Sequence, residues 1–369
     1  MIPVCIPTLG EEEQQNVADC VERSWISARG EYVTEFEDLF SSYCNREYGI
    51  STTSGTTALH LALKAIGVGD GDEVIIPTLT NAACAFAVRY CGADPVLVDI
   101  DSETWCMAPE EIEAAITDRT AAIMPVHLYG HPVDMEPILE LASEYDLRVI
   151  EDAAEAHGAE YRGQRAGNIG DIGCFSFYAN KLITTGEGGM VVTDDEAVAE
   201  RAEHLKDLAY SQPERYIHDA VGFNYRMTNL QAAVGVAQVE KLGRFVEMRR
   251  ENAARYNERL AAVEGIRTPP EKPWAKSNYW MYAITVEDSF PVNREELITS
   301  LSDQGIETRR FFAPMHEQPV FNQEGRFEGE HYPAAERASR RGLYLPSTSH
   351  LSPTEIDEVC AAIESIARS

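Results

Sequence analysis

The sequence predicts an α/β protein with a mostly parallel sheet flanked by helices, followed by a smaller α+β domain. Between Glu73 and Asp152, short apolar runs alternate with helical stretches, as in strands joined by helical crossovers. A helical pattern too long for one compact lobe runs from Leu230 to Val263, and a proline-rich segment follows over 264–279. These observations predict two units that the long helix connects.

We place the two domains at residues 1–250 and 251–369, with an N-terminal arm over 1–37. Short strands that alternate with helices around a proline-rich linker are typical of a small α+β unit. The elements predicted for the second domain are the strands Trp280–Val286 and Glu307–Phe312 and the helices Arg294–Gln304 and Pro353–Ala367.

The charge of the chain is extreme, with 61 acidic and 31 basic residues among 369 and a net charge of −30. Such a charge repels nucleic acid and anionic membranes at ordinary salt, so neither is an expected partner. The acids are spread along the chain, which is typical of proteins from halophiles, where high salt screens the self-repulsion. An acidic protein from a mesophile is the alternative interpretation.

The compartment is predicted from what the sequence lacks. No stretch of about 18 apolar residues occurs, so we expect no membrane span. The first ten residues have neither the basic start nor the apolar core of a signal peptide. The eight cysteines stand singly, without a Cys-x-x-Cys pair. We therefore expect a cytoplasmic protein with reduced cysteines and no metal site.

The first strand and helix meet at a junction suited to an anion. The pattern predicts a strand over Tyr48–Ser54 and a helix over Gly55–Ile66. Free backbone N–H groups and the helix dipole at such a junction favour a phosphate, and glycine lets it approach closely. A simple N-cap role for Ser54 is the alternative. Upstream, Trp25–Glu37 is predicted to be a polar loop that leads into a helix through Phe40.

Further strands and crossovers complete the predicted sheet. No Gly-x-Gly-x-x-Gly follows the first strand, which argues against a nicotinamide-binding fold. His127, after one strand, either contacts a ligand or is a structural histidine. The predicted elements are the strands Val74–Ile76, Val96–Val98, Ala121–Val126 and Arg148–Asp152, the helices Ala82–Tyr90, Glu110–Ile116, Met135–Tyr145 and Asp195–Asp207, and a loop over Tyr210–Gly222.

Lys181 lies between an apolar run and a glycine-rich segment, Ile183–Gly189, which leads into a predicted strand over Met190–Thr193. A lysine on a tight segment between buried strands is partly desolvated, and desolvation lowers the pKa of an amine. A neutral amine can attack a carbonyl and form a Schiff base. Taken alone, however, the pattern favours a solvated loop lysine.

Asp152 changes that interpretation, because it ends an apolar strand and ligands of open α/β sheets bind at strand ends. Pyridoxal phosphate needs a lysine for its aldehyde, a carboxylate against its pyridine nitrogen and a cradle for its phosphate. Lys181, Asp152 and the junction at Ser54–Thr56 are candidates for these three roles. The sequence therefore predicts a pyridoxal phosphate site.

Three stretches carry a resemblance to a known family: Glu151–Gly158, Gly170–Lys181 and Gly186–Gly189. They resemble the DegT/DnrJ/EryC1/StrS sugar aminotransferases, and the resemblance runs from about Trp25 to the C-terminus. It implies a fold-type I, pyridoxal phosphate-dependent homodimer with shared active sites. Such an enzyme moves the amino group of L-glutamate to a keto-sugar nucleotide.

The resemblance also implies roles for single residues. Asp152 would contact the ring nitrogen, and Glu155 the ring hydroxyl. Asn224 would reach the cofactor phosphate of the partner subunit. Asn81 departs from the family, which often has an aromatic residue there to stack on the ring. The implied cofactor-binding residues are Ser54, Gly55, Thr56, Asn81, Asp152, Glu155, Ser176, Asn180, Lys181 and Asn224, with Lys181 as the catalytic residue.

The predicted substrate residues are Tyr32, Arg226, Arg309 and His316, and each has a structural alternative. Several stretches most resemble family members that aminate GDP-4-keto-6-deoxymannose, whereas a UDP- or dTDP-linked keto-sugar is the alternative acceptor. Two other functions stay open. One is a sugar dehydratase, in which a histidine replaces the lysine, so Lys181 argues against it. The other is a non-catalytic regulatory or binding protein.

Overall fold

The computed structural model describes residues 1–211 and 216–368, so part of the predicted loop Tyr210–Gly222 lies outside the described residues. Its largest sheet has seven strands in the order β1-β9-β8-β5-β4-β2-β3. Strand β9 runs against both of its neighbours, and the other neighbouring pairs are parallel, as predicted. The strands are β1 (Tyr48–Thr52), β2 (Glu73–Pro77), β3 (Asp94–Val98), β4 (Thr120–Ile123), β5 (Arg148–Asp152), β8 (Ile172–Ser176) and β9 (Gly189–Thr193).

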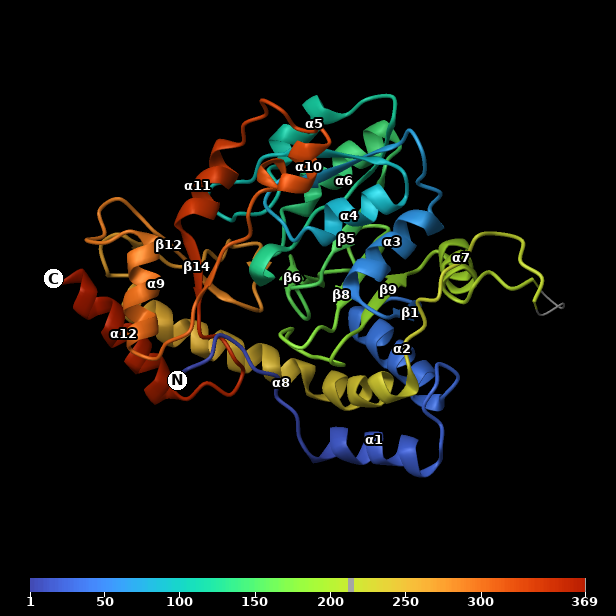
Figure 1. The fold of residues 1–369 in the computed structure, drawn as a ribbon, viewed down its shortest axis with the longest axis horizontal. Helices are drawn as coiled ribbons and strands as arrows, with labels where there is room; N and C mark the ends of the chain where they lie inside the picture. The colour runs from blue at the N-terminus through green and yellow to red at the C-terminus, as the bar shows by residue number, and fades with distance from the viewer. Residues whose placement is uncertain (212–215, 369) are drawn as a thin grey trace.

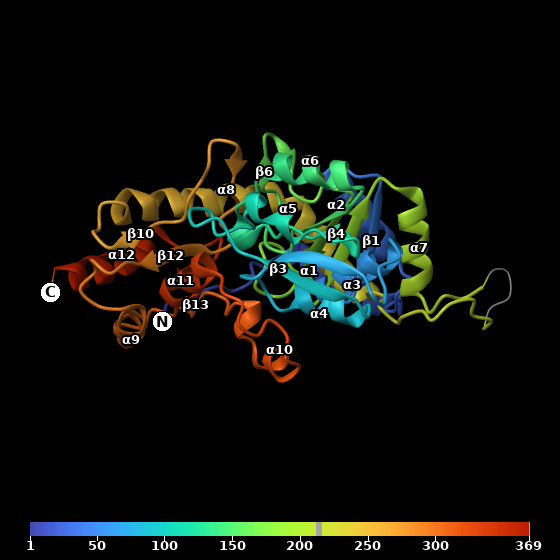
Figure 2. The same cartoon turned by 90° about the horizontal axis from the view of Figure 1, so that it is seen from above.

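Helices cover both faces of this sheet (Figures 1 and 2). Helices α3, α4 and α7 lie on one side, and α2 and α6 lie on the other. Buried apolar side chains pack against the faces of these strands, so the sheet forms the centre of the main core. The helices are α2 (Glu31–Cys44), α3 (Gly55–Ala65), α4 (Ala83–Tyr90), α5 (Ile112–Ala115), α6 (Met135–Tyr145) and α7 (Glu196–Lys206), with short 3₁₀ turns η1 (Pro109–Glu111) and η2 (Leu128–Gly130).

The long helix α8 (Asn229–Leu260) runs along the lower part of the molecule in Figure 1 and crosses the predicted boundary at residue 250. Its first half packs on α1 (Glu11–Glu22) and α2, and its second half packs on α12 (Pro353–Ala367). One continuous helix thus contributes side chains to the cores of both lobes.

The second lobe contains an antiparallel sheet in the order β10-β12-β14-β13. Tyr256 of α8 stacks on Tyr282 within its core, with ring centroids 4.5 Å apart. Ile2 joins the same core, so both termini lie at this end of the molecule (Figure 1). The elements are β10 (Ile266–Arg267), β12 (Tyr282–Val286), β13 (Arg309–Arg310), β14 (Gly342–Leu345), α9 (Arg294–Asp303), η3 (Met315–Glu317), α10 (Pro319–Gln323), α11 (Pro333–Arg341) and α12; a small separate sheet joins β6 (Glu160–Tyr161), β7 (Gln164–Arg165) and β11 (Ala275–Lys276).

The predicted strand Glu307–Phe312 is reduced to β13, and the predicted helix Glu110–Ile116 is divided between η1 and α5. Two regions near the N-terminus also differ from the prediction. The segment Trp25–Glu37 is not a loop throughout, because α2 begins at Glu31. Gly30 lies so close to α8 that an added Cβ would meet Asn229 at 2.0 Å, and this tertiary contact fixes the start of α2. Helix α1 was missed because only Glu13 and Cys20 of its twelve residues are buried, which leaves almost no apolar periodicity.

A buried acid anchors the end of β5. Glu151 is fully buried and accepts hydrogen bonds from the N–H groups of Gly167 (2.8 Å), Ile169 (2.7 Å) and Gly170 (2.7 Å). The N–H of Val133 donates to His127 Nδ1, so His127 Nε2 carries the proton and donates to Glu151 at 2.9 Å. His127 is therefore a structural histidine.

These donors also decide the charge state of the acid. Burial alone raises the pKa of Glu151, but the bonds from His127 and the backbone N–H groups outweigh it and hold that pKa below its ordinary value. Glu151 is thus a buried carboxylate with its partners in place, which is the condition under which a buried charge is tolerated.

We predict that Glu151→Ala lowers the free energy of unfolding by about 3–5 kcal/mol, because it leaves buried donors without an acceptor. Urea denaturation of the two proteins measures this difference. Glu258→Ala, at an exposed position of α8, is the matched control and should change the free energy of unfolding by less than about 0.5 kcal/mol. Equal effects of the two substitutions would show that the Glu151 anchor does not stabilise the fold.

Candidate active site

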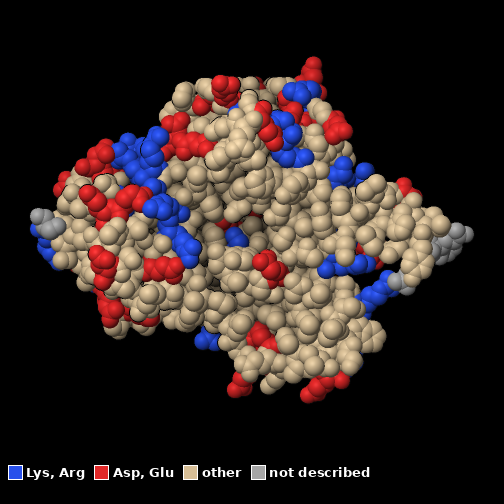
Figure 3. Space-filling model, in the orientation of Figure 1, with Lys and Arg blue, Asp and Glu red and all other residues tan. Residues whose placement is uncertain are grey.

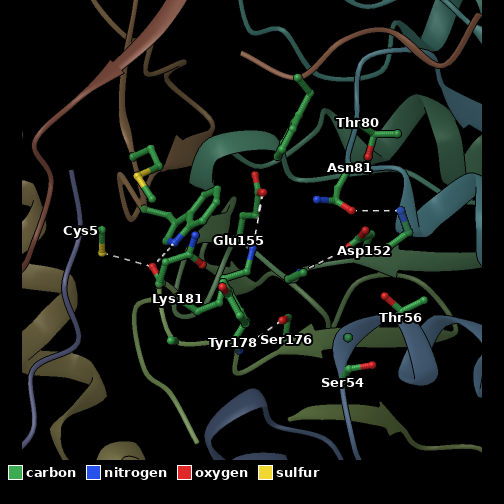
Figure 4. Close-up of a pocket in the computed structure, with 18 of the residues that line it drawn as sticks. Cys5, Ser54, Thr56, Thr80, Asn81, Asp152, Glu155, Ser176, Tyr178 and Lys181 are labelled. Carbon is green, nitrogen blue, oxygen red and sulfur yellow. Dashed lines mark hydrogen bonds and ion pairs between the residues drawn. The ribbon is translucent and has the colours of Figure 1, made fainter. Parts of the chain in front are cut away.

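A cavity of about 670 Å³ lies at the carboxyl edge of the seven-stranded sheet. Figure 3 shows it as a hollow near the middle of this face, with charged groups at its floor, and Figure 4 shows its lining. The second lobe closes one side of it, so residues from both lobes contribute. The predicted residues that line it are Ser54, Gly55, Thr56, Asn81, Asp152, Glu155, Ser176, Asn180, Lys181 and Arg309.

The Lys181 side chain is only 11% exposed, in agreement with the predicted burial. Its Nζ lies 3.5 Å from Glu155 Oε1 and 3.9 Å from the centroid of the Trp280 ring. The backbone around it is held as well, because the carbonyl of Asn180 accepts hydrogen bonds from Trp280 Nε1 (2.8 Å) and from the Cys5 thiol (3.3 Å). The amine is thus placed between an acid and an aromatic face.

Glu155 is buried beside this amine, and its Oε2 accepts the N–H of Tyr129 at 2.8 Å. Burial raises the pKa of Glu155 to about 7, although Lys181 and the Tyr129 N–H both act in the opposite direction. Tyr129 has a left-handed backbone, with φ of 55°, which is uncommon for a bulky residue and places its N–H toward the acid. A carboxyl group poised near neutrality therefore faces the lysine.

Asp152 enters the same cavity from the end of β5, and both of its oxygens have donors. The N–H of Ala154 donates to Oδ1 at 3.0 Å, and the thiol of Cys84 donates to Oδ2 at 2.9 Å. Burial raises the pKa of Cys84 well above its ordinary value, so the thiol stays protonated and serves as a donor. Nothing in the local sequence marks Cys84 for this role, because 68 residues separate the pair.

The phosphate cradle predicted from the sequence lies at the start of α3. Ser54 Oγ accepts the N–H of Thr57 at 3.2 Å, so Ser54 is an N-cap and also lines the cavity. A Cβ added at Gly55 would meet the Cβ of Ser176 at 2.7 Å, so only glycine permits β8 to approach the helix this closely. The helix dipole and the Ser176 hydroxyl suit an anion at this end.

Asn81, where the family often has an aromatic residue, closes the turn before α4. Its Oδ1 accepts the N–H of Ala83 at 3.0 Å, and the side chain borders the cavity near Asp152 (Figure 4). The amide oxygen is committed to the backbone, and an amide offers less area for stacking than an aromatic ring.

Four predicted site residues do not line the cavity of their own chain within the described residues. Tyr32 lies on α2, where its N–H donates to Asn229. Asn224 Oδ1 accepts from Arg226, which also pairs with Asp207. His316 is buried behind the cavity, with Nδ1 2.8 Å from Thr78 Oγ1 and Nε2 3.4 Å from Glu336.

Several residues of the site were not predicted, and four of the seven named below come from the second lobe. A local sequence signal exists only for Tyr178, which stands inside the Gly170–Lys181 motif. The others are brought to the site by tertiary packing, which no sequence spacing reports. The residues missed are Cys5, Tyr178, Trp280, Arg310, Phe312 and Tyr344 in the lining, and Cys84 beside Asp152.

The arrangement fits pyridoxal phosphate. A buried amine, a carboxylate with supported oxygens and a helix N-terminus line one cavity, which are the three groups that this cofactor requires. The volume is also in the range of cofactor pockets.

Comparisons with known proteins agree with this fit. The model of the DegT/DnrJ/EryC1/StrS aminotransferase family matches residues 7–364. The GDP-perosamine synthase of Escherichia coli O157:H7 is 44% identical over 362 residues, which are 98% of this chain and 97% of that protein. The GDP-perosamine synthase of Caulobacter vibrioides is 43% identical over 366 residues, covering 99% of this chain and 98% of that protein.

A solved structure extends the likeness to three dimensions. The pyridoxal phosphate form of the putative sugar aminotransferase Spr1654 from Streptococcus pneumoniae matches with a TM-score of 0.93 and 26% identity, covering 100% of this chain and 98% of that one. The predicted fold class and cofactor are therefore confirmed. The chain belongs to the DegT/DnrJ/EryC1/StrS aminotransferase family, and it is a pyridoxal phosphate-dependent enzyme.

Proposed function

We propose that this enzyme transfers the amino group of L-glutamate to GDP-4-keto-6-deoxymannose, giving GDP-perosamine for surface glycan synthesis. The observation that carries the proposal is the joint position of Lys181 and Asp152 in one cavity at the sheet edge, beside the N-terminus of α3. Two GDP-perosamine synthases, each more than 40% identical over almost the whole chain, support the choice of acceptor.

Residues of this chain have separate roles in the proposed reaction. When bound, the cofactor supplies an electron-poor ring that stabilises negative charge on the carbon where the amino group is exchanged. The carboxylate of Asp152 holds the proton on the ring nitrogen, and Glu155 bonds the ring hydroxyl. Ser54, Gly55, Thr56 and Ser176 hold the phosphate. Asn180 and Asn81 complete the cofactor contacts.

Lys181 is the catalytic residue in this proposal. It holds the cofactor covalently between turnovers. Once freed, its Nζ takes a proton from the amino-bearing carbon of the donor and returns one to the acceptor in the second half of the reaction. Burial of the amine keeps bulk water from competing for this proton.

We place the sugar nucleotide between Arg309 and Arg310, which line the mouth of the cavity. Their present partners are Glu307 (2.7 Å) and Glu295 (3.0 Å), which are exposed or half-buried acids that a diphosphate can replace. Guanidinium groups bind phosphate with paired hydrogen bonds. His316 acts on the substrate indirectly in this proposal, through its bond to Thr78 in the turn before Asn81.

We also propose a homodimer in which Asn224, Arg226 and Tyr32 serve the cavity of the partner subunit. Asn224 would contact the partner's cofactor phosphate, and Arg226 the carboxylate of the amino acid. Large apolar side chains near these residues are exposed, including Trp25, Ile26 and Val221, the last to 88%. Contiguous exposed apolar groups mark protein interfaces.

The acceptor is tested by incubating the purified enzyme with L-glutamate and GDP-, UDP- or dTDP-linked 4-keto-6-deoxy sugars. We predict amino-sugar product with the GDP sugar, detected by mass spectrometry, at a kcat/KM at least about 100-fold above the other two, since binding groups that go unpaired are costly. A preference for the UDP or dTDP sugar would refute the proposed acceptor. Absence of transfer to all three would refute the function.

The shared site is tested by mixing one inactive variant with one impaired variant. Lys181→Ala should abolish turnover and the absorbance of the lysine-bound cofactor, and Asn224→Ala should lower turnover by weakening phosphate binding. If each site combines Lys181 of one subunit with Asn224 of the other, unfolding and refolding the mixture should restore about a quarter of wild-type turnover, because half of the dimers carry one intact site. Mixing Lys181→Ala with itself is the control. No recovery would contradict a site built from two subunits.

We propose that the enzyme works in the cytoplasm, at high salt. All eight cysteines are free and seven are buried, which suits a reducing compartment. Within residues 1–211 and 216–368, no helix is long and apolar enough to cross a membrane. The excess of acids gives a net charge of −30, and counter-ions screen its self-repulsion.

High salt should therefore stabilise this protein. We predict that its urea midpoint rises steadily as KCl is raised from millimolar to molar concentration, because screening weakens repulsion in the compact state. Sucrose of equal osmolality is the control, since it strengthens burial without screening charge. A midpoint that rises equally in sucrose, or falls in KCl, would contradict a role for charge screening.

A further inference from the structure

The Trp280 ring lies directly against the amine of Lys181. Nζ is 3.9 Å from the ring centroid, well within the distance at which an ammonium is attracted to an aromatic face. Trp280 is only 3% exposed, so water does not weaken this contact. Tryptophan gives the strongest such interaction of the aromatic residues.

The position of the ring is fixed by two further contacts. Its Nε1–H donates to the carbonyl of Asn180, the residue before the lysine, at 2.8 Å. Its backbone N–H donates to Asn278 Oδ1 at 2.8 Å. The ring is therefore tied both to the lysine segment and to the second lobe, and its face is held toward Nζ.

On its other side, the amine has the carboxyl group of Glu155 at 3.5 Å. Both neighbours interact more favourably with an ammonium than with a neutral amine. Only a lysine that is free of the cofactor presents a whole ammonium to these two neighbours. The site between Trp280 and Glu155 thus suits the lysine when it is not joined to the cofactor.

We propose that Trp280 and Glu155 form a resting site for the ammonium of Lys181 in the half of the cycle when the cofactor carries the amino group. Trp280 is a positioning residue: it stabilises the freed, protonated lysine and keeps it beside the carbon to which it returns a proton. This inference rests on the proposed role of Lys181.

Other charged and titratable groups face the same cavity and contribute to the field at Nζ. Their effect stays constant when only the ring is changed, so a change at position 280 isolates the contribution of the ring. These groups are Asp152, Glu155, Glu187, Arg309, Arg310, Cys5, Tyr178 and Tyr344 in the lining, and His157 packed behind the lysine.

The test measures how easily Lys181 is labelled. The holoenzyme is first reduced with borohydride, and peptide mapping locates the attached cofactor. If the cofactor is not on Lys181, the proposed role of Lys181 fails at this step. The enzyme is then loaded with pyridoxamine phosphate, which leaves the lysine free, and is pulsed with acetic anhydride across a pH series. Mass spectrometry gives the pH of half-maximal labelling at Lys181, with the more exposed Lys276 as internal reference.

Because acetylation needs the neutral amine, loss of the ring should move the Lys181 midpoint to lower pH. We expect a fall of about one pH unit for Trp280→Leu, which is about tenfold in the neutral fraction, and a smaller fall for Trp280→Phe, which keeps an aromatic face. Trp274→Leu, at a tryptophan outside this cavity, is the matched control and should leave the midpoint unchanged.

The proposal can still be tested if Trp280→Leu does not fold. Fluorotryptophan incorporated into the wild-type chain weakens the negative face of the ring and nearly keeps its shape, so it should lower the Lys181 midpoint in a protein that still folds. If the midpoint is the same in wild type, Trp280→Leu and the fluorinated protein, Trp280 only fills space and the proposal is overturned. A lower thermal unfolding temperature without a shifted midpoint has the same meaning.

Discussion

The buried hydrogen bond from His127 to Glu151 is the interaction on which the active site depends. Glu151 receives four donors, and these hold the carboxyl end of β5 where two loops cross it. Successive side chains of a strand point to opposite faces, so anchoring Glu151 on one face directs Asp152 into the cavity on the other. Two adjacent acids thus differ in function: Glu151 anchors the strand, and Asp152 enters the cavity, where we propose that it contacts the cofactor.

The cavity exists only because both lobes close around the sheet edge. Tyr129 connects them: its N–H donates to Glu155, and its hydroxyl accepts the N–H of Phe312 from the second lobe at 3.2 Å. Trp280 makes a second connection, to Lys181 and Asn180. The acid and the amine at the centre of the proposed chemistry are therefore coupled to the segment that we assign to the sugar nucleotide. A shift of one lobe against the other would change the surroundings of the amine.

The two carboxyl groups that we place against the cofactor have different environments, although they lie only three positions apart in the sequence. Each oxygen of Asp152 accepts a hydrogen bond, one from the Ala154 N–H and one from the Cys84 thiol, which fixes the orientation of the carboxyl group. Burial dominates at Glu155 and raises its pKa to about 7, so it can donate or accept a hydrogen bond near neutral pH. This difference suits the roles that we propose, which are a fixed partner for the ring nitrogen and an adaptable partner for the ring hydroxyl.

The sequence by itself determined the elements whose signals are local. The alternation of strands and helices, the long helix α8, the closing helix Pro353–Ala367 and the cofactor motif around Lys181 were all predicted, because periodicity and glycine spacing record them. The family resemblance added the role that we propose for Glu155, which no spacing rule assigns. Helix α1 escaped because its buried side is too small to leave a pattern.

Only the tertiary structure decided which distant residues meet these local motifs. Cys84 reaches Asp152 across 68 residues, and Trp280 reaches Lys181 from the other lobe. The tertiary structure also gives His127 a structural role, through its bond to Glu151, and places His316 behind the cavity. The physical reason is that strand order and lobe packing arise from the burial of the whole apolar surface, whereas a sequence pattern records only neighbours along the chain.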